Sequence, residues 1–383
     1  MNSAASPRRI DLDWVRIIAF MLLILYHVGM YYVTWGWHIK SPHASSALEP
    51  FMLLTNPWRL ALLFLVSGAA TSFLLAKSTP GGFVKARSGR LLWPLLFGML
   101  VIVPPQSYYE VVEKLQYPGT YLEFWGRYLA FDHSFCKDKD CLILPTWNHL
   151  WFVAYLWVYT MLLALVVKIS PAAQQRASES LAGTLTGWKL VVLPWLYLAL
   201  VRILLLPHFP QTHALVDDWY NHALYLSVFA IGFLLARQDG FWLELRRMRW
   251  LALLLAVSSY LAIEIYFAAY AGDATPPDAL RTAMRSVYAL NQWTAIIAAL
   301  GWANYWSPVD GPVRRYLTEA IFPLYILHQT VIILLARALR DADLPAFPEG
   351  LLLAGGTAVI CLGMYEIIRR LGPLRPLFGL KRN

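Results

Sequence analysis

Two ionisable side chains lie in one strongly apolar stretch near the start of the chain, LDWVRIIAFMLLILYHVGMYY. Arg16 and His27 are eleven residues apart, and in a helix this spacing is three turns plus roughly 20°, which places both on one face. The rise between them is about 16 Å, roughly half the thickness of a hydrocarbon core. We therefore expect Arg16 near one membrane boundary and His27 near the midplane, with His38 continuing the same face outward.

An imidazole at mid-depth could act as a general base, because histidine exchanges a proton near neutral pH. Ionisable groups are costly inside a membrane and usually face an interior cavity, which favours a functional role for His27. The alternatives are an interhelical hydrogen bond for His27 and a snorkelling interfacial position for Arg16. Asp13 precedes Arg16 by three residues, so the two side chains could pair and fix the direction of the guanidinium.

A second histidine is expected at the same depth, in the stretch FPLYILHQTVIILL. His328 lies nine residues into an apolar segment that enters from the cytoplasmic side, and Tyr325 lies three residues earlier on the same face. A Tyr–His pair alone is more often packing between helices. Because His328 is expected at the same depth as His27, a catalytic role for the Tyr325–His328 pair stands beside the packing role.

Several other polar or small residues lie where a substrate could pass. Arg59 and His149 open the second and fourth apolar segments at their outer ends, and Trp151 follows in NHLWFVAY. An aromatic belt is the alternative for Trp151. Ser67 and Gly68 fall near the middle of the second segment, where small residues let either a helix or a ligand approach closely.

The stretch KARSGRLLWP places Arg87 and Arg90 three residues apart in a basic loop just before a helix. Guanidinium groups bind phosphate in a bidentate way, so this pair could hold a phosphorylated ligand. A basic loop can equally be a topological anchor, because cytoplasmic loops are rich in lysine and arginine.

The composition indicates which elements must position these residues. The 383 residues are 58% hydrophobic and only 14% charged, whereas a soluble domain has roughly a quarter charged residues. Apolar runs of about 17–25 residues recur, long enough to cross a hydrocarbon core of about 30 Å. We predict an all-α, polytopic membrane protein with a single domain over residues 1–383 and about ten transmembrane helices. The predicted segments are 14–36, 58–76, 91–109, 148–168, 188–206, 220–236, 250–271, 287–305, 319–338 and 350–368.

The distribution of basic residues predicts the orientation. They are about twice as frequent on one side of these segments as on the other, and the positive-inside rule makes that side, with both termini, cytoplasmic. This bias explains the net charge of +9, so no nucleic-acid partner is required, and the basic face can contact anionic membrane lipids. The first segment is too long for a cleaved signal and ends in an aromatic belt, which indicates a retained helix.

The longest connection, residues 104–146, is expected to be an extracytoplasmic loop with one or two short amphipathic helices on the outer surface. Pro104 and Pro105 interrupt the end of the third segment, so the sequence does not define where that helix ends. Cys136 and Cys141 in this loop could form a disulfide in an oxidising periplasm or remain free thiols. No cluster of Cys and His has metal-binding spacing, so no metal is expected.

These motifs, in their order and spacing, resemble the acyltransferase-3 family of ten-helix membrane O-acyltransferases. The resemblance rests on LDWVR with its Arg-x10-His spacing, FLVSG, RSGRLLWP, NHLWF and LYILH, and it runs from the first segment to the last. It is strongest to the glucan succinyltransferase branch, in which TWGWHIKS and the late YEI with Glu366 also have counterparts. Each motif is short, and only the set is specific.

The resemblance implies an acyltransferase of the bacterial inner membrane that uses acyl-coenzyme A as donor and has no permanently bound cofactor. A succinyl or acetyl group would go to a hydroxyl of a periplasmic glucan, an exopolysaccharide or a lipid-linked sugar. Unlike many members, this chain has no fused extracytoplasmic domain, so partners would present the acceptor. Matched motif by motif, activity would need Arg16 and His27, coenzyme A would meet Arg87, Arg90 and Arg16, and the remaining motifs point to Ser67, Gly68, Tyr325 and His328.

In such a reaction His27 would take the hydroxyl proton as the sugar oxygen attacks the thioester, and an acyl-imidazole on His27 is a variant. The oxyanion could be stabilised by Tyr325, His328 or Ser67. The sugar would reach the site past His38, Arg59, His149 and Trp151, while Asp13 and Glu366 would support the catalytic groups.

Two other functions stay open. A secondary transporter also carries charged groups within about ten helices, and Glu264 and Arg202, both inside apolar segments, would suit it. The other alternative is a non-catalytic membrane partner of a glycan-synthesis complex, which would not need the Arg16–His27 spacing. The sequence indicates no particular oligomeric state.

Overall fold

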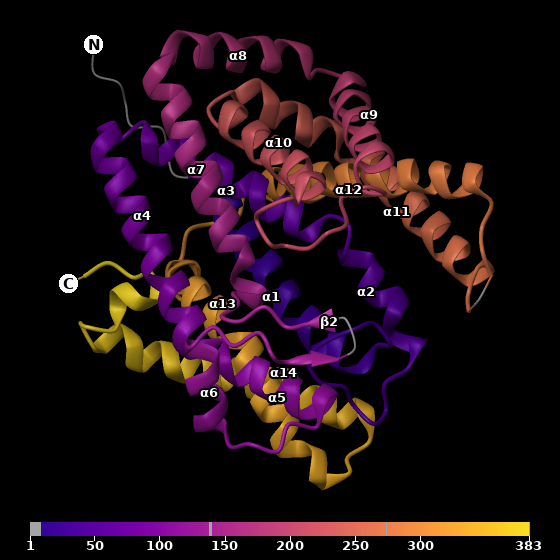
Figure 1. The fold of residues 1–383 in the computed structure, drawn as a ribbon. Helices are drawn as coiled ribbons and strands as arrows, with labels where there is room; N and C mark the ends of the chain where they lie inside the picture. The colour runs from indigo at the N-terminus through magenta and orange to yellow at the C-terminus, as the bar shows by residue number, and fades with distance from the viewer. Residues whose placement is uncertain (1–8, 138–139, 273, 383) are drawn as a thin grey trace. The chain divides into compact units, whose positions relative to one another are not determined.

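The chain is built almost wholly of α-helices (Figure 1). The structure is a computed structural model that describes residues 9–137, 140–272 and 274–382. Within these ranges the only strands are β1 (Cys136–Lys137) and β2 (Asp140–Cys141), which pair antiparallel. The predicted all-α class is therefore confirmed.

The described part of the chain has seven helical stretches that are long and apolar enough to cross a membrane. They are Ile10–Tyr32, Ser46–Leu75, Pro80–Leu115, Asn148–Ile169, Asp239–Ala269, Pro312–Ala342 and Ala346–Arg370. Pro171–Thr184 and Lys189–Leu204 are bent by 112° against each other and would together form an eighth. A multi-pass membrane protein is thus confirmed, while the count of ten and the cytoplasmic termini stay predictions.

Two of the ten predicted segments differ from these stretches. Segment 220–236 corresponds to Trp219–Leu235, an apolar helix of 17 residues. Segment 287–305 lies inside the longer helix Asp278–Trp306, whose first half, DALRTAMRSVYALNQW, is too polar for a lipid-facing span.

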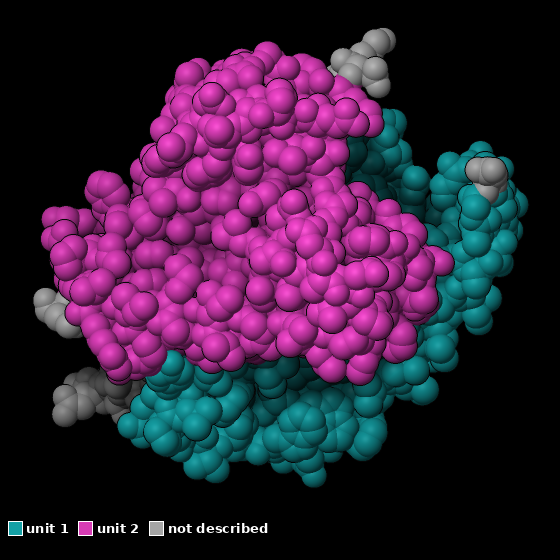
Figure 2. Space-filling view, turned by 90° about the horizontal axis from the view of Figure 1, so that it is seen from below, with its two compact units in different colours: residues 1–19, 53–83, 159–318 teal, residues 20–52, 84–158, 319–383 magenta. Residues whose placement is uncertain are grey.

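The helices form two compact units, coloured separately in Figure 2. Unit 1 combines Met1–Ala19, Leu53–Phe83 and Tyr159–Thr318, and unit 2 combines Phe20–Met52, Val84–Val158 and Glu319–Asn383. Helices α1 (Ile10–Tyr32), α2 (Glu49–Thr55), α4 (Pro80–Phe97), α7 (Trp151–Ile169) and α13 (Pro312–Leu339) contribute residues to both units.

Unit 1 is organised by close helix pairs. Its remaining helices are α3 (Arg59–Leu75), α8 (Pro171–Thr184), α9 (Lys189–Leu204), α10 (Trp219–Leu235), α11 (Asp239–Ala269) and α12 (Asp278–Trp306). At the crossing of α3 and α10, a Cβ on Gly68 would lie 2.0 Å from the carbonyl oxygen of Phe229, and one on Gly232 would lie 2.0 Å from that of Leu65. Both glycines therefore let the two backbones touch.

Unit 2 packs the second half of α1 against α13. Its core contains Ile24 and Val28 of α1 with Ile332 and Ile333 of α13, and Leu353 of α14 joins them. The other elements are η1 (Ser46–Leu48), η2 (Gly98–Ile102), α5 (Pro104–Leu115), α6 (Tyr121–Leu129), η3 (Asn148–Leu150), η4 (Arg340–Ala342), α14 (Ala346–Arg370) and η5 (Arg375–Phe378). Since one face of α1 meets one face of α13, polar groups on those faces are brought together.

The proline pair that made the third segment uncertain begins α5, directly after the π-helical turn η2 that follows α4. Proline has no N–H, so backbone carbonyls before Pro104 and Pro105 need other donors. These donors are the Tyr128 hydroxyl to Met99 at 2.9 Å, the Trp125 indole to Leu100 at 3.0 Å and the Thr330 hydroxyl to Ile102 at 2.6 Å. These bonds tie α6 and α13 to the η2 turn between α4 and α5.

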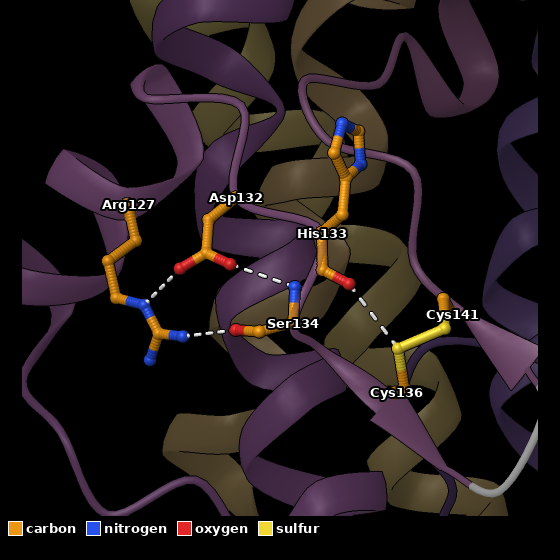
Figure 3. The surroundings of a disulfide bond; sticks show 6 residues. All are labelled: Arg127, Asp132, His133, Ser134, Cys136 and Cys141. Atoms are coloured by element: carbon orange, nitrogen blue, oxygen red, sulfur yellow. Dashed lines mark hydrogen bonds and ion pairs between the residues drawn. A yellow bond between two sulfur atoms is a disulfide. The ribbon is translucent and has the colours of Figure 1, made fainter.

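Two short helices, α5 and α6, occupy the predicted loop 104–146, as expected; their place on the outer surface stays a prediction. Cys136 and Cys141 form a disulfide, which settles the alternative left open by the sequence (Figure 3). Beside it, Arg127 pairs with Asp132 at 2.6 Å. Hydrogen bonds from Ser134 and Arg127 lower the pKa of Asp132 to about 2, so this carboxylate stays charged at any physiological pH.

Candidate active site

The two histidines that the sequence placed at one depth are in contact. Nδ1 of His27 on α1 lies 2.7 Å from Nε2 of His328 on α13, and the rings stack with centroids 4.9 Å apart. His328 is fully buried and His27 is half-buried. The α1–α13 packing described above holds the two imidazoles face to face, so we call them the histidine dyad.

The hydrogen-bond partners assign the proton positions of the histidine dyad. Nδ1 of His328 lies 2.6 Å from the carbonyl oxygen of Tyr325, and because a carbonyl only accepts, this nitrogen carries the hydrogen. Nε2 of His328 then has a lone pair and accepts from Nδ1–H of His27. In the neutral dyad, the lone pair of His27 is therefore on Nε2.

This arrangement is suited to general base catalysis. A neutral imidazole with a fixed lone pair can accept the proton of a hydroxyl, and a hydrogen bond from its other nitrogen holds the ring in place. Within the described ranges, no group of three His, Cys, Asp or Glu side chains is arranged to hold a metal ion.

Tyr325 orients the dyad through its backbone, while its hydroxyl donates to the carbonyl of His149. Its ring packs between Phe20, at a centroid distance of 5.3 Å, and Phe322, at 6.2 Å. Since the hydroxyl already has an acceptor, these contacts favour a positioning role for Tyr325 over the predicted stabilisation of an oxyanion.

Beside the dyad lies a polar network centred on Gln106, a residue that the sequence interpretation did not single out. Gln106 and His149 are buried, and Nε2 of His149 donates to the carbonyl of Ile326 at 3.1 Å. The Gln106 side chain fills its whole hydrogen-bonding capacity. Its amide nitrogen donates to Thr330 (2.7 Å) and His149 (3.4 Å), and its oxygen accepts from Asn148 (3.0 Å) and Gln329 (3.0 Å).

His38 joins this network, although not by the continuous helix that the sequence suggested. Helix α1 ends at Tyr32, where the Lys40 ammonium binds the carbonyls of Met30 and Val33. Burial lowers the pKa of Lys40.

The turn after α1 gives His38 two polar partners. Its Nδ1 lies 2.5 Å from the carboxylate of Glu110, and its Nε2 accepts from Gln329 at 2.9 Å. Lys114 binds the same carboxylate at 2.6 Å. Imidazole, carboxylate and amide groups thus form one chain of contacts from His38 to His149.

Arg16 lies in unit 1 and has the predicted acidic neighbour. Its Nη2 is 3.9 Å from Asp13 and 3.4 Å from the carbonyl of Thr318. Asp13 also forms an ion pair with the buried Arg314, a partner that the local i,i+3 spacing could not reveal. The catalytic role of Arg16 stays a prediction.

Four further predicted residues have clear structural surroundings. Arg59 is 2% exposed in unit 1 and donates to Thr55 at 3.2 Å. Gly68, next to Ser67, lies at the α3–α10 crossing, so helix packing, the alternative given above, accounts for it. Trp151 is buried in unit 2, with its ring 5.2 Å from that of Tyr155. Their ligand-binding roles stay predictions.

Arg87 and Arg90 lie on α4, which begins at Pro80, and not in the loop that the sequence suggested. Arg87 is half-buried and Arg90 is exposed. A Cβ on Gly379 would lie 3.2 Å from the carbonyl oxygen of Arg90 and 2.5 Å from the ring of Phe322. The Arg90 backbone is therefore close to Phe322, whose ring stacks on that of Tyr325, a neighbour of His328.

Glu366, predicted as a supporting residue, pairs with its own helix. Its carboxylate lies 3.1 Å from Arg369 and 3.3 Å from Arg370 on α14. These i,i+3 and i,i+4 pairs stabilise the end of the helix. A role in supporting the catalytic groups stays a prediction.

Comparison with known proteins identifies the family. The family model described as an acyltransferase domain, acyltransferase-3, matches residues 9–366. The chain belongs to the acyltransferase-3 family. Glucans biosynthesis protein C of Salmonella gallinarum is 25% identical over 236 residues, which are 61% of this chain and 58% of that protein. The same-named protein of Salmonella paratyphi B is 27% identical over 160 residues, 42% of this chain and 39% of that protein.

The chain thus matches less than two thirds of the length of these curated relatives. No solved structure matches it significantly. The family match nevertheless covers the sequence from before α1 to near the end of α14, as the order of the short motifs had predicted.

Proposed function

We propose that this acyltransferase-3 protein is a membrane O-acyltransferase in which His27 is the general base. It would move a succinyl or acetyl group from acyl-coenzyme A, on the cytoplasmic side of a bacterial inner membrane, to a hydroxyl of a periplasmic or cell-surface glycan. The observation that carries this proposal is the histidine dyad, with the Tyr325 carbonyl at one end and the lone pair of His27 at the other.

The transfer then follows from the proton positions. The acceptor hydroxyl gives its proton to Nε2 of His27 while its oxygen bonds to the thioester carbonyl carbon. The tetrahedral intermediate collapses by breaking the carbon–sulfur bond, and the leaving thiolate takes the proton back from His27. His328 accepts from Nδ1–H throughout, so it stabilises the transient imidazolium without adding a charge of its own.

The α4 and α13 contacts support the donor side. The phosphates of coenzyme A would bind the guanidinium groups of Arg87 and Arg90. From Arg90 the arm would pass Phe322 and Tyr325 toward His328. Phe322 and His328 are six residues apart on one helix, a rise of about 9 Å, which a thin pantetheine arm can cover.

The polar network supports the acceptor side. A sugar needs many donors and acceptors, and the chain from His38 and Glu110 through Gln106 to His149 supplies both kinds. The name of the curated relatives, glucans biosynthesis protein C, supports a glucan as acceptor. His149 and Trp151 would lie beside the incoming sugar.

The transporter alternative gains no support from its two residues. Arg202 donates to the hydroxyl of Tyr220 at 2.7 Å, and its guanidinium lies 3.6 Å from the ring centroid of Tyr288. Among the described residues, Glu264 forms no ion pair with Arg202, and its Oε1 is buried without a hydrogen-bond partner.

The decisive experiment is turnover by purified His27→Ala and His328→Asn in nanodiscs, with succinyl- or acetyl-coenzyme A and a glucan acceptor. His27→Ala should abolish transfer, and His328→Asn should lower kcat roughly 10²-fold or more with little change in the KM for the donor. His133→Asn, in the outer segment, is the matched control and should retain wild-type activity. Turnover that survives His27→Ala would exclude the general-base role of His27. Failure of the wild-type protein to bind coenzyme A would exclude an acyltransferase that uses acyl-coenzyme A as donor.

A further inference from the structure

The last twelve described residues fold back onto unit 2. After α14 the chain turns into η5, and Phe378, Gly379 and Leu380 are buried. The Phe378 ring meets Phe97 of α4 at a centroid distance of 5.4 Å. We call residues 371–382 the C-terminal segment.

Gly379 is the point of closest contact between the C-terminal segment and two helices. Its φ of 70° is in the left-handed region, which favours glycine. Any Cβ there would also lie 2.5 Å from two ring atoms of Phe322 and 3.2 Å from the carbonyl oxygen of Arg90. Conformation and space therefore both require glycine, and the segment holds α4, at Arg90, against α13.

Arg375 links the C-terminal segment to α14 and α13. Its Nε donates to the carbonyl of Lys381 at 2.6 Å, and its Nη1 donates to the carbonyl of Arg369 at 2.7 Å. Its Nη2 lies 3.6 Å from the carboxylate of Glu319, which also interacts electrostatically with Arg90. Arg90 and Arg375 thus share one acidic neighbour, so the two arginines and Glu319 together carry a net positive charge.

The contact has a direct connection to the dyad. Phe322 stacks on Tyr325 at 6.2 Å, Tyr325 lies 5.8 Å from His328, and His328 lies 4.9 Å from His27, all between ring centroids. An anionic ligand that binds Arg90 and reaches the dyad would therefore pass the ring of Phe322, which Gly379 contacts.

We infer that the C-terminal segment is one wall of the donor site. It fixes Arg90 next to Phe322, so that the phosphates and the arm of acyl-coenzyme A meet one continuous surface. Gly379 and Arg375 are positioning residues for the donor. This inference rests on the proposed function and adds to it a part of the chain outside the family match, which ends at residue 366.

The test is Gly379→Ala in the purified full chain, with Arg370→Ala as matched control. The new methyl group should displace the segment, raising the KM for the acyl donor and the Kd for coenzyme A about tenfold or more, because misplaced binding groups cost affinity steeply. The kcat at saturating donor should change by less than about twofold, since the atoms nearest to the new methyl group belong to Phe322 and Arg90 and not to His27 or His328. Arg370 is an exposed guanidinium paired with Glu366, and its removal should leave both constants unchanged.

Hydrogen exchange of the wild-type protein gives a second readout that does not depend on the variant's folding. Saturating coenzyme A should slow exchange in residues 374–380. Unchanged exchange there with coenzyme A bound, or an unchanged or lowered KM in Gly379→Ala, would overturn the inference while leaving the proposed function intact. If Arg90→Ala leaves the Kd for coenzyme A unchanged, the donor site is not at α4, and the inference fails together with the donor placement, while the general-base role of His27 is decided separately by His27→Ala.

Discussion

At the scale of single residues, the main finding is that uncharged groups orient the imidazole of His27. In many hydrolases a carboxylate holds the catalytic imidazole, whereas here a second imidazole does so, and a backbone carbonyl holds that one in turn. A buried carboxylate at this depth would carry a large desolvation cost. The neutral partner avoids that cost and still selects one tautomer of His27.

Gln106 offers a prediction at the same scale. Replacing it with leucine would leave Asn148, Gln329 and Thr330 with unmet hydrogen bonds, each worth about 1–3 kcal/mol when buried. Gln106→Leu should therefore lower the thermal midpoint of the purified protein markedly, as measured by melting in detergent. Gln175→Leu changes an exposed amide that bonds only Glu179 among the described residues, and its midpoint should stay within error. Equal midpoints for the two variants would contradict the importance of the network.

At the scale of elements, close backbone contacts decide where helices can tolerate a methyl group. Gly68→Ala would press its Cβ against the Phe229 backbone at 2.0 Å, so α3 and α10 must separate, at a cost of about 1–3 kcal/mol or more. Gly363→Ala on α14 meets nothing within 4 Å and should stabilise by up to about 1 kcal/mol through helix propensity. Denaturant or thermal unfolding of the two variants checks this contrast, and a tolerated Gly68→Ala would show that the crossing is loose.

Much of the element pattern was readable from the sequence, because an apolar run in lipid must form a helix to satisfy its backbone. The equal depth of His27 and His328 could be predicted for the same reason, because the rise per residue of a helix converts sequence position into depth. Partners across distant segments were not readable. Gln106 bonds Thr330, which is 224 positions away, and Gln292 of α12 bonds the Pro57 carbonyl, 235 positions away. Local periodicity carries no information on such pairs.

At the scale of the whole molecule, the disulfide reports on orientation. If loop 104–146 faces the periplasm, a membrane-impermeant reductant added to spheroplasts should expose Cys136 and Cys141 to an impermeant maleimide, which adds two mass labels per chain. The double variant Cys136→Ser/Cys141→Ser is the control, because Cys361 is buried and should stay unlabelled. Labelling only after the cells are lysed would place the loop in the cytoplasm and reverse the predicted topology.

The saturated amide of Gln106 also limits how unit 2 can move. Two of its four partners, Gln329 and Thr330, lie on α13 and the other two, Asn148 and His149, lie in the turn before α7. Sliding α13 by one residue along α5 would therefore break the bonds to Gln329 and Thr330 together. Because these bonds share one amide and strengthen one another, we expect α5, α13 and the turn before α7 to move together. A movement that opens unit 2 to a bulky molecule is therefore expected in helices that contribute no residue to the Gln106 network.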